Sequence, residues 1–221
     1  MSQGIRLRHV FITGGTGFMG RRLIAELLPR GHQVRALVRQ GSEAKLPPGC
    51  TAVVGNALKK ESYAAHVRPA DTFVQLAGVT HPNPAKAEEF RAVDLGSARA
   101  AISAAVEAGI EQFVYVSVAQ PAPVMKFYLR VRAECEEMIR ASGLDATILR
   151  PWYVLGPGRR WPYLLAPMYW LFERLPPTRE SAQRLGLVTL EQMARAMVSA
   201  IESPCRGIRV LGVPEIRQPR W

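Results

Sequence analysis

The chain of 221 residues is 48% hydrophobic and 21% charged, the composition of a folded globular protein with a sizeable core. Nowhere do about 18 apolar residues follow one another, so we expect no transmembrane helix. The net charge of +11 would suit nucleic acid or an anionic membrane, but the basic residues are mostly arginine and no run exceeds two. We therefore interpret them as a solvated surface, predict no nucleic-acid partner and expect a cytoplasmic location.

Three cysteines and four histidines are scattered along the chain. Cys50, Cys135 and Cys205 lie far apart, with no Cys-x-x-Cys pair and no histidine at the spacing of metal ligands. We interpret the cysteines as reduced thiols of a cytoplasmic protein. The sequence therefore predicts neither a disulfide nor a metal site.

The first half of the chain alternates short apolar runs with turns. Residues 10–13 form an apolar run before a glycine-rich turn, and leucine and isoleucine then recur with helical spacing up to Gly31. Further strands are predicted at 34–38, 52–54 and 72–76, each separated by turn or helix signals.

The second half repeats this alternation with longer helices. An alanine-rich stretch at 85–108 predicts a helix ending at Gly109, and 113–117 is a near-continuous apolar strand. A charged amphipathic helix is predicted at 127–141 and a sixth strand at 146–149. Strands that alternate with helices indicate a parallel sheet with right-handed crossovers. The predicted fold class is α/β, a doubly wound parallel sheet of the Rossmann type.

After Pro151 the pattern loosens, before one more helix at 190–201 and a short strand at 209–211. We expect a single domain over 1–221, in which 152–221 form a small cap on the substrate side. The aromatic-rich segment from Trp161 to Leu175 should cover the substrate cleft or pack against a second subunit, because so many large apolar residues are seldom left in water. The second case would make the protein a homodimer.

The turn at 13–20, Thr-Gly-Gly-Thr-Gly-Phe-Met-Gly, matches the dinucleotide-binding fingerprint. Glycines are needed there because the backbone must turn sharply and approach the pyrophosphate, while the next helix presents free N–H groups to the anion. A strand precedes the turn and an amphipathic helix follows it, which is the context that the motif requires. The residues expected to line the cofactor here are Gly14, Thr16, Gly17, Phe18 and Met19.

The end of the second strand indicates which dinucleotide is preferred, because an acidic side chain there would hold the ribose 2′-hydroxyl of NAD. The strand ends in Arg39, and no carboxylate occurs before Glu43. An arginine fork suits a bidentate contact with a 2′-phosphate. The sequence predicts NADP(H) as the preferred cofactor, with NAD(H) as the second choice.

Six stretches together resemble the short-chain dehydrogenase/reductase superfamily, in particular its extended and atypical branches, which are NmrA-like or epimerase/dehydratase-like. They cover residues 10–158 in the family's order. The stretches are the turn at 13–20, Gly55-Asn56-Ala57, Leu76-Ala77-Gly78, Phe113 to Ser117, Tyr128-x-x-x-Arg132 with Glu134, and Arg150-Pro151 followed by Gly156-Pro157.

The resemblance implies where the cofactor lies. Asn56, which stands where the family commonly has Asp, and Ala57 would lie along the adenine. The nicotinamide half would contact Leu76, Ala77 and Gly78 along the ribose and Pro151 beside the amide.

The resemblance also implies a catalytic set. Ser117 would orient the substrate, Tyr128 would transfer the proton, and Asp94 lies near a family asparagine. Arg132 stands where the family has Lys, four residues after the tyrosine and therefore on the same helix face. Its charge keeps the electrostatic part of the lysine's role, whereas its planar fork does not copy the hydrogen bonds of an ammonium.

These features support two hypotheses from different classes. In the first, the chain is an NADP(H)-dependent oxidoreductase or epimerase-like enzyme that acts on a small molecule with a carbonyl or hydroxyl group. In the second, it is a non-catalytic dinucleotide-binding module, a redox sensor or an assembly subunit. The geometry of Ser117, Tyr128 and Arg132 relative to the nicotinamide distinguishes the two.

Overall fold

The computed structural model describes residues 6–79, 87–157 and 179–219. The Trp161 to Leu175 segment, with its expected covering or dimer-forming role, lies outside these residues. Among the described residues, no helix is both long and apolar enough to cross a membrane.

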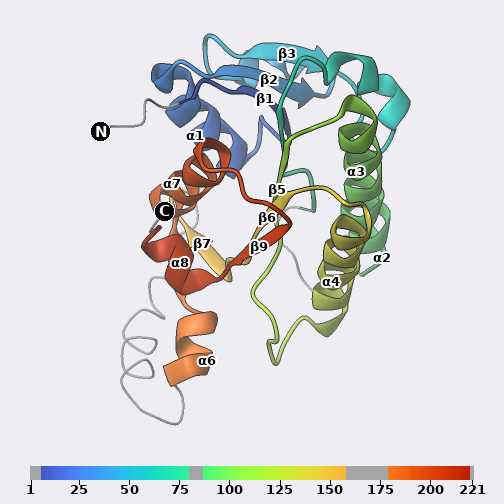
Figure 1. Cartoon of the computed structure of the whole chain (residues 1–221). Helices are drawn as coiled ribbons and strands as arrows, with labels where there is room; N and C mark the ends of the chain where they lie inside the picture. Colours follow the sequence, from blue (N-terminus) through green and yellow to red (C-terminus); the bar gives the residue numbers. More distant parts are fainter. Residues whose placement is uncertain (1–5, 80–86, 158–178, 220–221) are drawn as a thin grey trace.

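Strands and helices alternate through most of the described chain (Figure 1). The first half consists of β1 His9–Thr13, α1 Phe18–Leu27, β2 Gln33–Val38, β3 Thr51–Val54 and β4 Thr72–Gln75. A helical stretch follows, made of α2 Ala87–Glu89, η6 Phe90–Leu95 and α3 Gly96–Ala108. The next elements are β5 Gln112–Val116, α4 Lys126–Ala141, β6 Ala146–Leu149 and β7 Tyr153–Leu155. The chain ends with α6 Arg179–Arg184, β8 Leu187–Thr189, α7 Leu190–Glu202, β9 Ile208–Leu211 and α8 Val213–Arg217.

The main sheet has seven strands in the order β3-β2-β1-β4-β5-β6-β9, and every neighbouring pair is parallel. This confirms the predicted doubly wound α/β class. The strand predicted at 209–211 pairs with β6 as the seventh strand, so the C-terminal part of the chain completes the sheet. A separate parallel pair, β7 with β8, lies outside the main sheet.

Helices cover both faces of the sheet. In Figure 1, α1, α7 and α8 lie on one side of the strands, and α3 and α4 lie on the other. A row of rings crosses the core beside α3, because Phe11, Phe73 and Phe113 occupy matching register positions on β1, β4 and β5. Their ring centroids are 5.2 and 5.4 Å apart, which is the spacing of packed aromatic side chains. These contacts fix the strands whose ends form the site.

Two connections differ from a strict alternation of strands and helices. Between β2 and β3, all of which is described, the only helical element is the 3-10 turn Glu43–Lys45. Between β3 and β4, also fully described, the only helical elements are the 3-10 turns Lys60–Ser62 and Ala64–His66. The helix expected at 85–108 contains a π-helical segment, η6, before α3. A π-helical turn inside a helix often marks a functional site.

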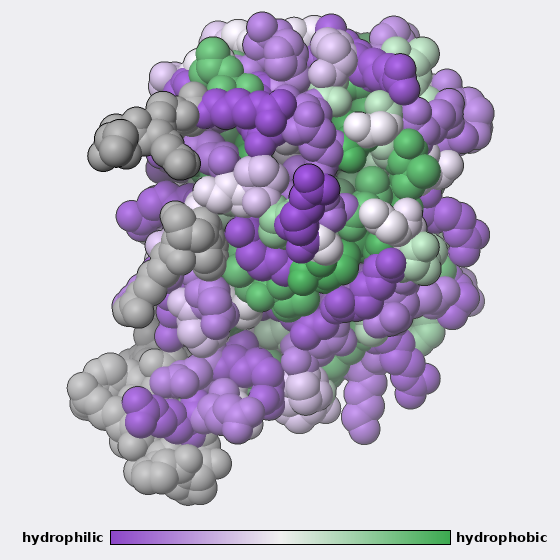
Figure 2. All heavy atoms as spheres, viewed as in Figure 1, coloured by the Kyte–Doolittle hydropathy of each residue, from purple (hydrophilic) through white to green (hydrophobic). Residues whose placement is uncertain are grey.

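The surface is mostly hydrophilic on the face shown in Figure 2, where apolar atoms are exposed in the middle. Val210, on the edge strand β9, is one of the large hydrophobic residues that are exposed, at 37%. Cys50, Cys135 and Cys205 form no disulfide bond with one another.

Candidate active site

The glycine-rich turn between β1 and α1 leaves no room for side chains. Gly14 has a left-handed backbone (φ 70°), and a Cβ there would lie 2.8 Å from the carbonyl carbon of Leu76. A Cβ on Gly15 would lie 2.7 Å from the Cβ of Ala36, and one on Gly20 would overlap the Gly14 carbonyl oxygen. The turn is therefore built by the close approach of backbone to backbone, which only glycine permits.

Gly17 marks the place where a phosphate would approach. It is the N-cap of α1 in an extended conformation, with φ −76° and ψ 176°, and no side chain caps the helix. The first turn of α1 carries no acidic residue. The first N–H groups of an α-helix have no partner within the helix and attract anions. This helix end fits the pyrophosphate of a dinucleotide.

The strand order reverses between β1 and β4, and in open α/β sheets ligands bind in the crevice at such a point. A buried polar network holds the two strand ends together. The Thr13 hydroxyl donates to the Gln75 side-chain oxygen and accepts from the N–H groups of Leu76 and Ala77 at 3.3 and 3.4 Å. Gln75 donates in turn to the Ser97 hydroxyl at 3.1 Å. The loop after β4 is thereby fixed beside the glycine-rich turn.

Arg39 and Asn56 occupy the carboxyl ends of the next two strands. Arg39 follows β2 directly and is exposed, and its guanidinium forms no hydrogen bond or ion pair with the described residues. Asn56 follows β3, and its Oδ1 accepts the N–H of Leu58 at 2.9 Å, which makes an Asx turn. The amide nitrogen of Asn56 is therefore the group that remains to contact an adenine.

The other residues expected around the cofactor lie at the same edge of the sheet. The Phe18 ring packs on Gly156, where a Cβ would lie 2.6 Å from the ring, and Met19 packs against the core. Thr16 is half-buried in the turn. Pro151 is buried, and its carbonyl oxygen accepts a backbone N–H from the loop after β5 at 2.9 Å.

Arg132, on α4, is 8% exposed and is surrounded by acceptors. Its Nε donates to the Tyr128 hydroxyl at 3.1 Å, and its Nη1 donates to the Tyr115 hydroxyl and the Val116 carbonyl oxygen at 3.0 Å each. Its Nη2 lies 2.5 Å from Oδ1 of Asp94. We call these five residues the Arg132 cluster. It joins the predicted tyrosine and arginine to a carboxylate 38 positions earlier in the chain.

Asp94 lies in the π-helical segment η6, and its side chain is completely buried. Its Oδ2 accepts the N–H of Val79 at 3.1 Å. A Cβ on Gly78 would lie 2.8 Å from Asp94 Oδ1 and 2.9 Å from Arg132 Nη2. The ion pair is therefore packed directly against the backbone of the loop after β4, the loop expected to contact the ribose.

Burial shapes the ionisation of this cluster. Burial alone would lower the pKa of Arg132, but Tyr115, Tyr128 and Asp94 together raise it well above its usual value. Burial raises the pKa of Asp94, against the opposing effects of Arg132 and the Val79 N–H. Burial also raises the pKa of Tyr115, which stays a neutral phenol. Arg132 therefore places a permanent positive charge beside the Tyr128 hydroxyl.

The sequence profile of a family described as NAD(P)H-binding matches residues 14–204, which include the turn, the Arg132 cluster and most of the C-terminal region. The chain belongs to this NAD(P)H-binding family. The glycine-rich turn and the strand ends at β1 and β4 lie within or at the border of the matched residues.

Individual relatives agree with this assignment. The "Ceramide reductase" of Caulobacter vibrioides (strain NA1000 / CB15N) is 29% identical over 215 residues, or 96% of this chain and 65% of the relative. The "Photosystem II assembly factor Ycf39" of Synechocystis sp. (strain ATCC 27184 / PCC 6803 / Kazusa) is 31% identical over 145 residues, or 64% of this chain and 44% of the relative. The chain thus spans less than two thirds of the length of either relative.

A crystal structure of a short-chain dehydrogenase/reductase superfamily protein from Agrobacterium tumefaciens with bound NAD has the same fold. Its TM-score is 0.68 at 18% sequence identity, over 92% of this chain and 77% of that chain. At this identity the likeness shows that the two chains share a fold.

A second buried cluster in this NAD(P)H-binding chain surrounds Glu136, which is 1% exposed. The Ser117 hydroxyl donates to its Oε1 at 2.6 Å, and the Gln120 side-chain amide donates to the same oxygen at 3.0 Å. Arg150 forms a bidentate pair through Nε at 3.0 Å and Nη2 at 2.5 Å, and Arg140 lies 3.6 Å away. We call these five residues the Glu136 cluster.

The sequence named Glu134 beside the tyrosine and arginine, but it is Glu136 that faces the sheet. Glu134 is 45% exposed and lies 3.8 Å from Arg91. Glu136 lies four residues after Arg132, and residues at this spacing share a helix face, so the helical period could have found it. In the described part of the chain Ser117 and Tyr128 have different partners, since Ser117 donates to Glu136 and Tyr128 accepts from Arg132.

Proposed function

We propose that the chain is an NADPH-dependent reductase in which Tyr128 donates the proton that accompanies reduction of a carbonyl substrate. One observation carries the proposal. The permanently charged guanidinium of Arg132 donates a hydrogen bond to the Tyr128 hydroxyl at 3.1 Å. A cation that donates to a phenol oxygen stabilises the negative charge which that oxygen acquires when its proton leaves.

The residues of the chain would handle the proton. NAD(P)H, when bound in the crevice, supplies the hydride for the carbonyl carbon. The O–H bond of Tyr128 breaks, its proton joins the carbonyl oxygen to complete the product alcohol, and the electron pair stays on the Tyr128 oxygen. Arg132 stabilises that phenolate until water returns a proton. The same pair would serve the reverse oxidation or an epimerase-like reaction.

Ser117 has a narrower role in this proposal than the resemblance implies. Its proton is committed to the buried carboxylate of Glu136 at 2.6 Å. Its oxygen lone pairs are what it can offer to a substrate. Ser117 would therefore orient a hydroxyl group, which donates, better than a carbonyl group, which needs a donor.

The preference for NADPH rests on Arg39. An exposed arginine at the end of β2, without a partner among the described residues, can bind a 2′-phosphate with two N–H groups. The Agrobacterium structure holds NAD, but at 18% identity it speaks for the fold alone. The substrate would be a small molecule, as the name of the ceramide reductase suggests for that relative.

A second candidate is a non-catalytic dinucleotide-binding module. Each nitrogen of Arg132 already binds a group of the protein, so this residue is less free than a lysine to reach a ribose. The assembly factor Ycf39 among the relatives fits the same hypothesis.

Calorimetric titration with NADPH and NADH tests the cofactor. Arg39→Ala should weaken NADPH binding about tenfold to a hundredfold, since a hydrogen bond to a charged group contributes about 1.5–3 kcal/mol, and should leave NADH unchanged. Arg206→Ala is the matched control, because Arg206 is fully exposed before β9, at the opposite edge of the sheet. Equal affinities of the unmodified chain for both cofactors would reject the NADPH preference.

A screen of aldehydes, ketones and quinones with NADPH tests the reaction. With any substrate found, Tyr128→Phe should lower kcat by about 10²–10⁴-fold, the usual contribution of a general acid, and leave NADPH affinity intact. Tyr63→Phe is the control, because the buried Tyr63 hydroxyl has no hydrogen-bond partner among the described residues. Tight NADPH binding without reduction of any compound would favour the binding module.

A further inference from the structure

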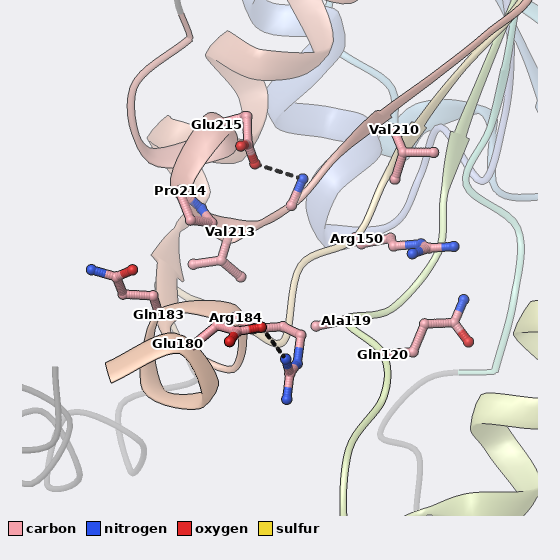
Figure 3. Close-up of a pocket in the computed structure, with 11 residues that line it drawn as sticks. Ala119, Gln120, Arg150, Glu180, Gln183, Arg184, Val210, Val213, Pro214 and Glu215 are labelled. Atoms are coloured by element: carbon pink, nitrogen blue, oxygen red, sulfur yellow. Dashed lines mark hydrogen bonds and ion pairs between the residues drawn. The ribbon is translucent and has the colours of Figure 1, made fainter. Parts of the chain in front are cut away.

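A cavity of about 260 Å³ opens at the carboxyl ends of β5, β6 and β9, next to the Glu136 cluster (Figure 3). Complete small-molecule sites usually measure about 300–1,000 Å³, so this cavity would hold one part of a ligand. Arg150 and Gln120 lie on one side of it, and Val213 and Pro214 lie on the other. Val210 of β9 adds a further apolar wall.

Glu136 determines what Gln120 and Arg150 can offer to this cavity. A carboxylate accepts hydrogen bonds only, so the Gln120 atom 3.0 Å from it is the amide nitrogen. The carbonyl oxygen of Gln120 is left as an acceptor. Arg150 donates to Glu136 through Nε and Nη2. Its Nη1 forms no hydrogen bond with the described residues. Gln120 and Arg150, which both line the cavity, therefore keep one acceptor and one donor that Glu136 does not use.

The charges around the cavity do not favour an anion. Arg150 is paired with Glu136, and Arg184 lies 3.5 Å from Glu180. Glu215 also lines the cavity, where it accepts the N–H of Gly212 at 2.9 Å. The lining residues thus carry two guanidinium groups and two carboxylates, those of Glu180 and Glu215, so a bound carboxylate would find no net positive charge there.

We propose that this cavity is a substrate subsite for a neutral hydroxyl or carboxamide group on an aliphatic chain. Such a group both donates and accepts, which matches Gln120 Oε1 and Arg150 Nη1, and the aliphatic part contacts Val210, Val213 and Pro214. Glu136 is the positioning residue that orients both polar side chains and discriminates against carboxylates. This inference rests on the proposed function, because it assigns the cavity to the substrate of that reaction.

The test compares three six-carbon probes by saturation-transfer NMR with the full chain saturated with NADP⁺. Hexanamide and 1-hexanol should bind about tenfold more tightly than hexanoate, the factor that about 1.4 kcal/mol of binding free energy produces. Val210→Trp should abolish binding of the neutral probes by filling the cavity. Val54→Trp is the matched control, since Val54 is 50% exposed on β3, the opposite edge strand.

Two variants then test the polar groups. Glu136→Gln should raise hexanoate affinity about tenfold by removing the buried carboxylate. Gln120→Leu, at a half-buried position, should weaken both neutral probes about tenfold and leave hexanoate unchanged. This second variant decides the matter if the first does not fold.

Four results would overturn the subsite: no binding of the neutral probes, hexanoate bound as tightly as hexanamide, undiminished binding to Val210→Trp, or unchanged selectivity in Gln120→Leu. Because the readout is binding without turnover, a chain that shows the selectivity but reduces no carbonyl would contradict the proposed reaction alone.

Discussion

The Arg132 and Glu136 clusters lie one helical turn apart on α4 and are built as opposites. In the first, a buried cation is surrounded by acceptors, and its counter-charge, Asp94, is completely buried. In the second, a buried carboxylate is surrounded by donors, and its counter-charge, Arg150, is 26% exposed. The paired charges of the first cluster are buried away from water, and only Tyr128 is half-buried, whereas the second cluster opens on a cavity. One buried charge can therefore hold a proton-transfer group in place while its neighbour sets the polar groups that meet a ligand.

Because of this difference, we expect the Arg132 cluster to contribute more to the free energy of unfolding than the Glu136 cluster. A charge that loses its partner inside the protein stays unsolvated, whereas a partly exposed one can turn toward water. Variants that remove one member of each pair should therefore have unequal costs. Urea denaturation of such variants tests whether the burial of the remaining partner sets the cost.

Arg132→Met should lower the free energy of unfolding by about 3–5 kcal/mol, because it leaves the buried carboxylate of Asp94 without its partner. Urea denaturation measures the loss. Arg99→Met is the matched control, since Arg99 is exposed on α3 and should change stability by less than about 0.5 kcal/mol. A loss at Arg132 as small as that at Arg99 would mean that the paired charges are not buried away from water.

Glu136→Gln should lower the free energy of unfolding by about 1.5–3 kcal/mol, since hydrogen bonds to a charged group are lost while Arg150 can be hydrated. Glu137→Gln is the control, because Glu137 is the next residue, is 75% exposed and pairs only with Arg140 at 3.5 Å among the described residues. If Glu136→Gln cost more than Arg132→Met, the exposure of the counter-charge would not set the cost.

The sequence predicted those parts of the site that the backbone builds. The glycine-rich turn and the position of Arg39 could be predicted from local sequence pattern, because each directly follows a strand that the sequence indicates. The Tyr128 and Arg132 contact also follows, since four residues on a helix bring two side chains together.

The partners of the buried charges were harder to predict. Asp94 meets Arg132 across 38 positions, in a π-helical segment for which the sequence carries no signal. Among the acidic residues at 134, 136 and 137, the helical period points to Glu136, but its pairing with Arg150 depends on the packing of α4 on the sheet. The seventh strand, β9, was predicted as a strand, but its place beside β6 depends on tertiary pairing.

The last prediction concerns how Asp94 and Arg132 depend on each other, and its expected effect is the smallest. By the resemblance stated from the sequence, lysine is expected at position 132, and Asp94 lies near the place of a family asparagine. Arg132→Lys alone keeps the charge but gives up the fork that reaches Tyr115, Val116 and Tyr128. Asp94→Asn alone leaves a buried cation without its counter-charge.

Arg132→Lys weakens the ion pair that Asp94→Asn removes, so the sum of their costs counts part of that loss twice. The double variant should therefore be more stable than that sum by about 1 kcal/mol, within the range usual for residues in contact. Urea denaturation of the four chains measures the coupling, and Glu136→Gln combined with Arg132→Lys is the control for two residues that share a helix face but no bond. Additive costs for Asp94 and Arg132 would show that the two charges act independently, and the description of one cluster would then be wrong.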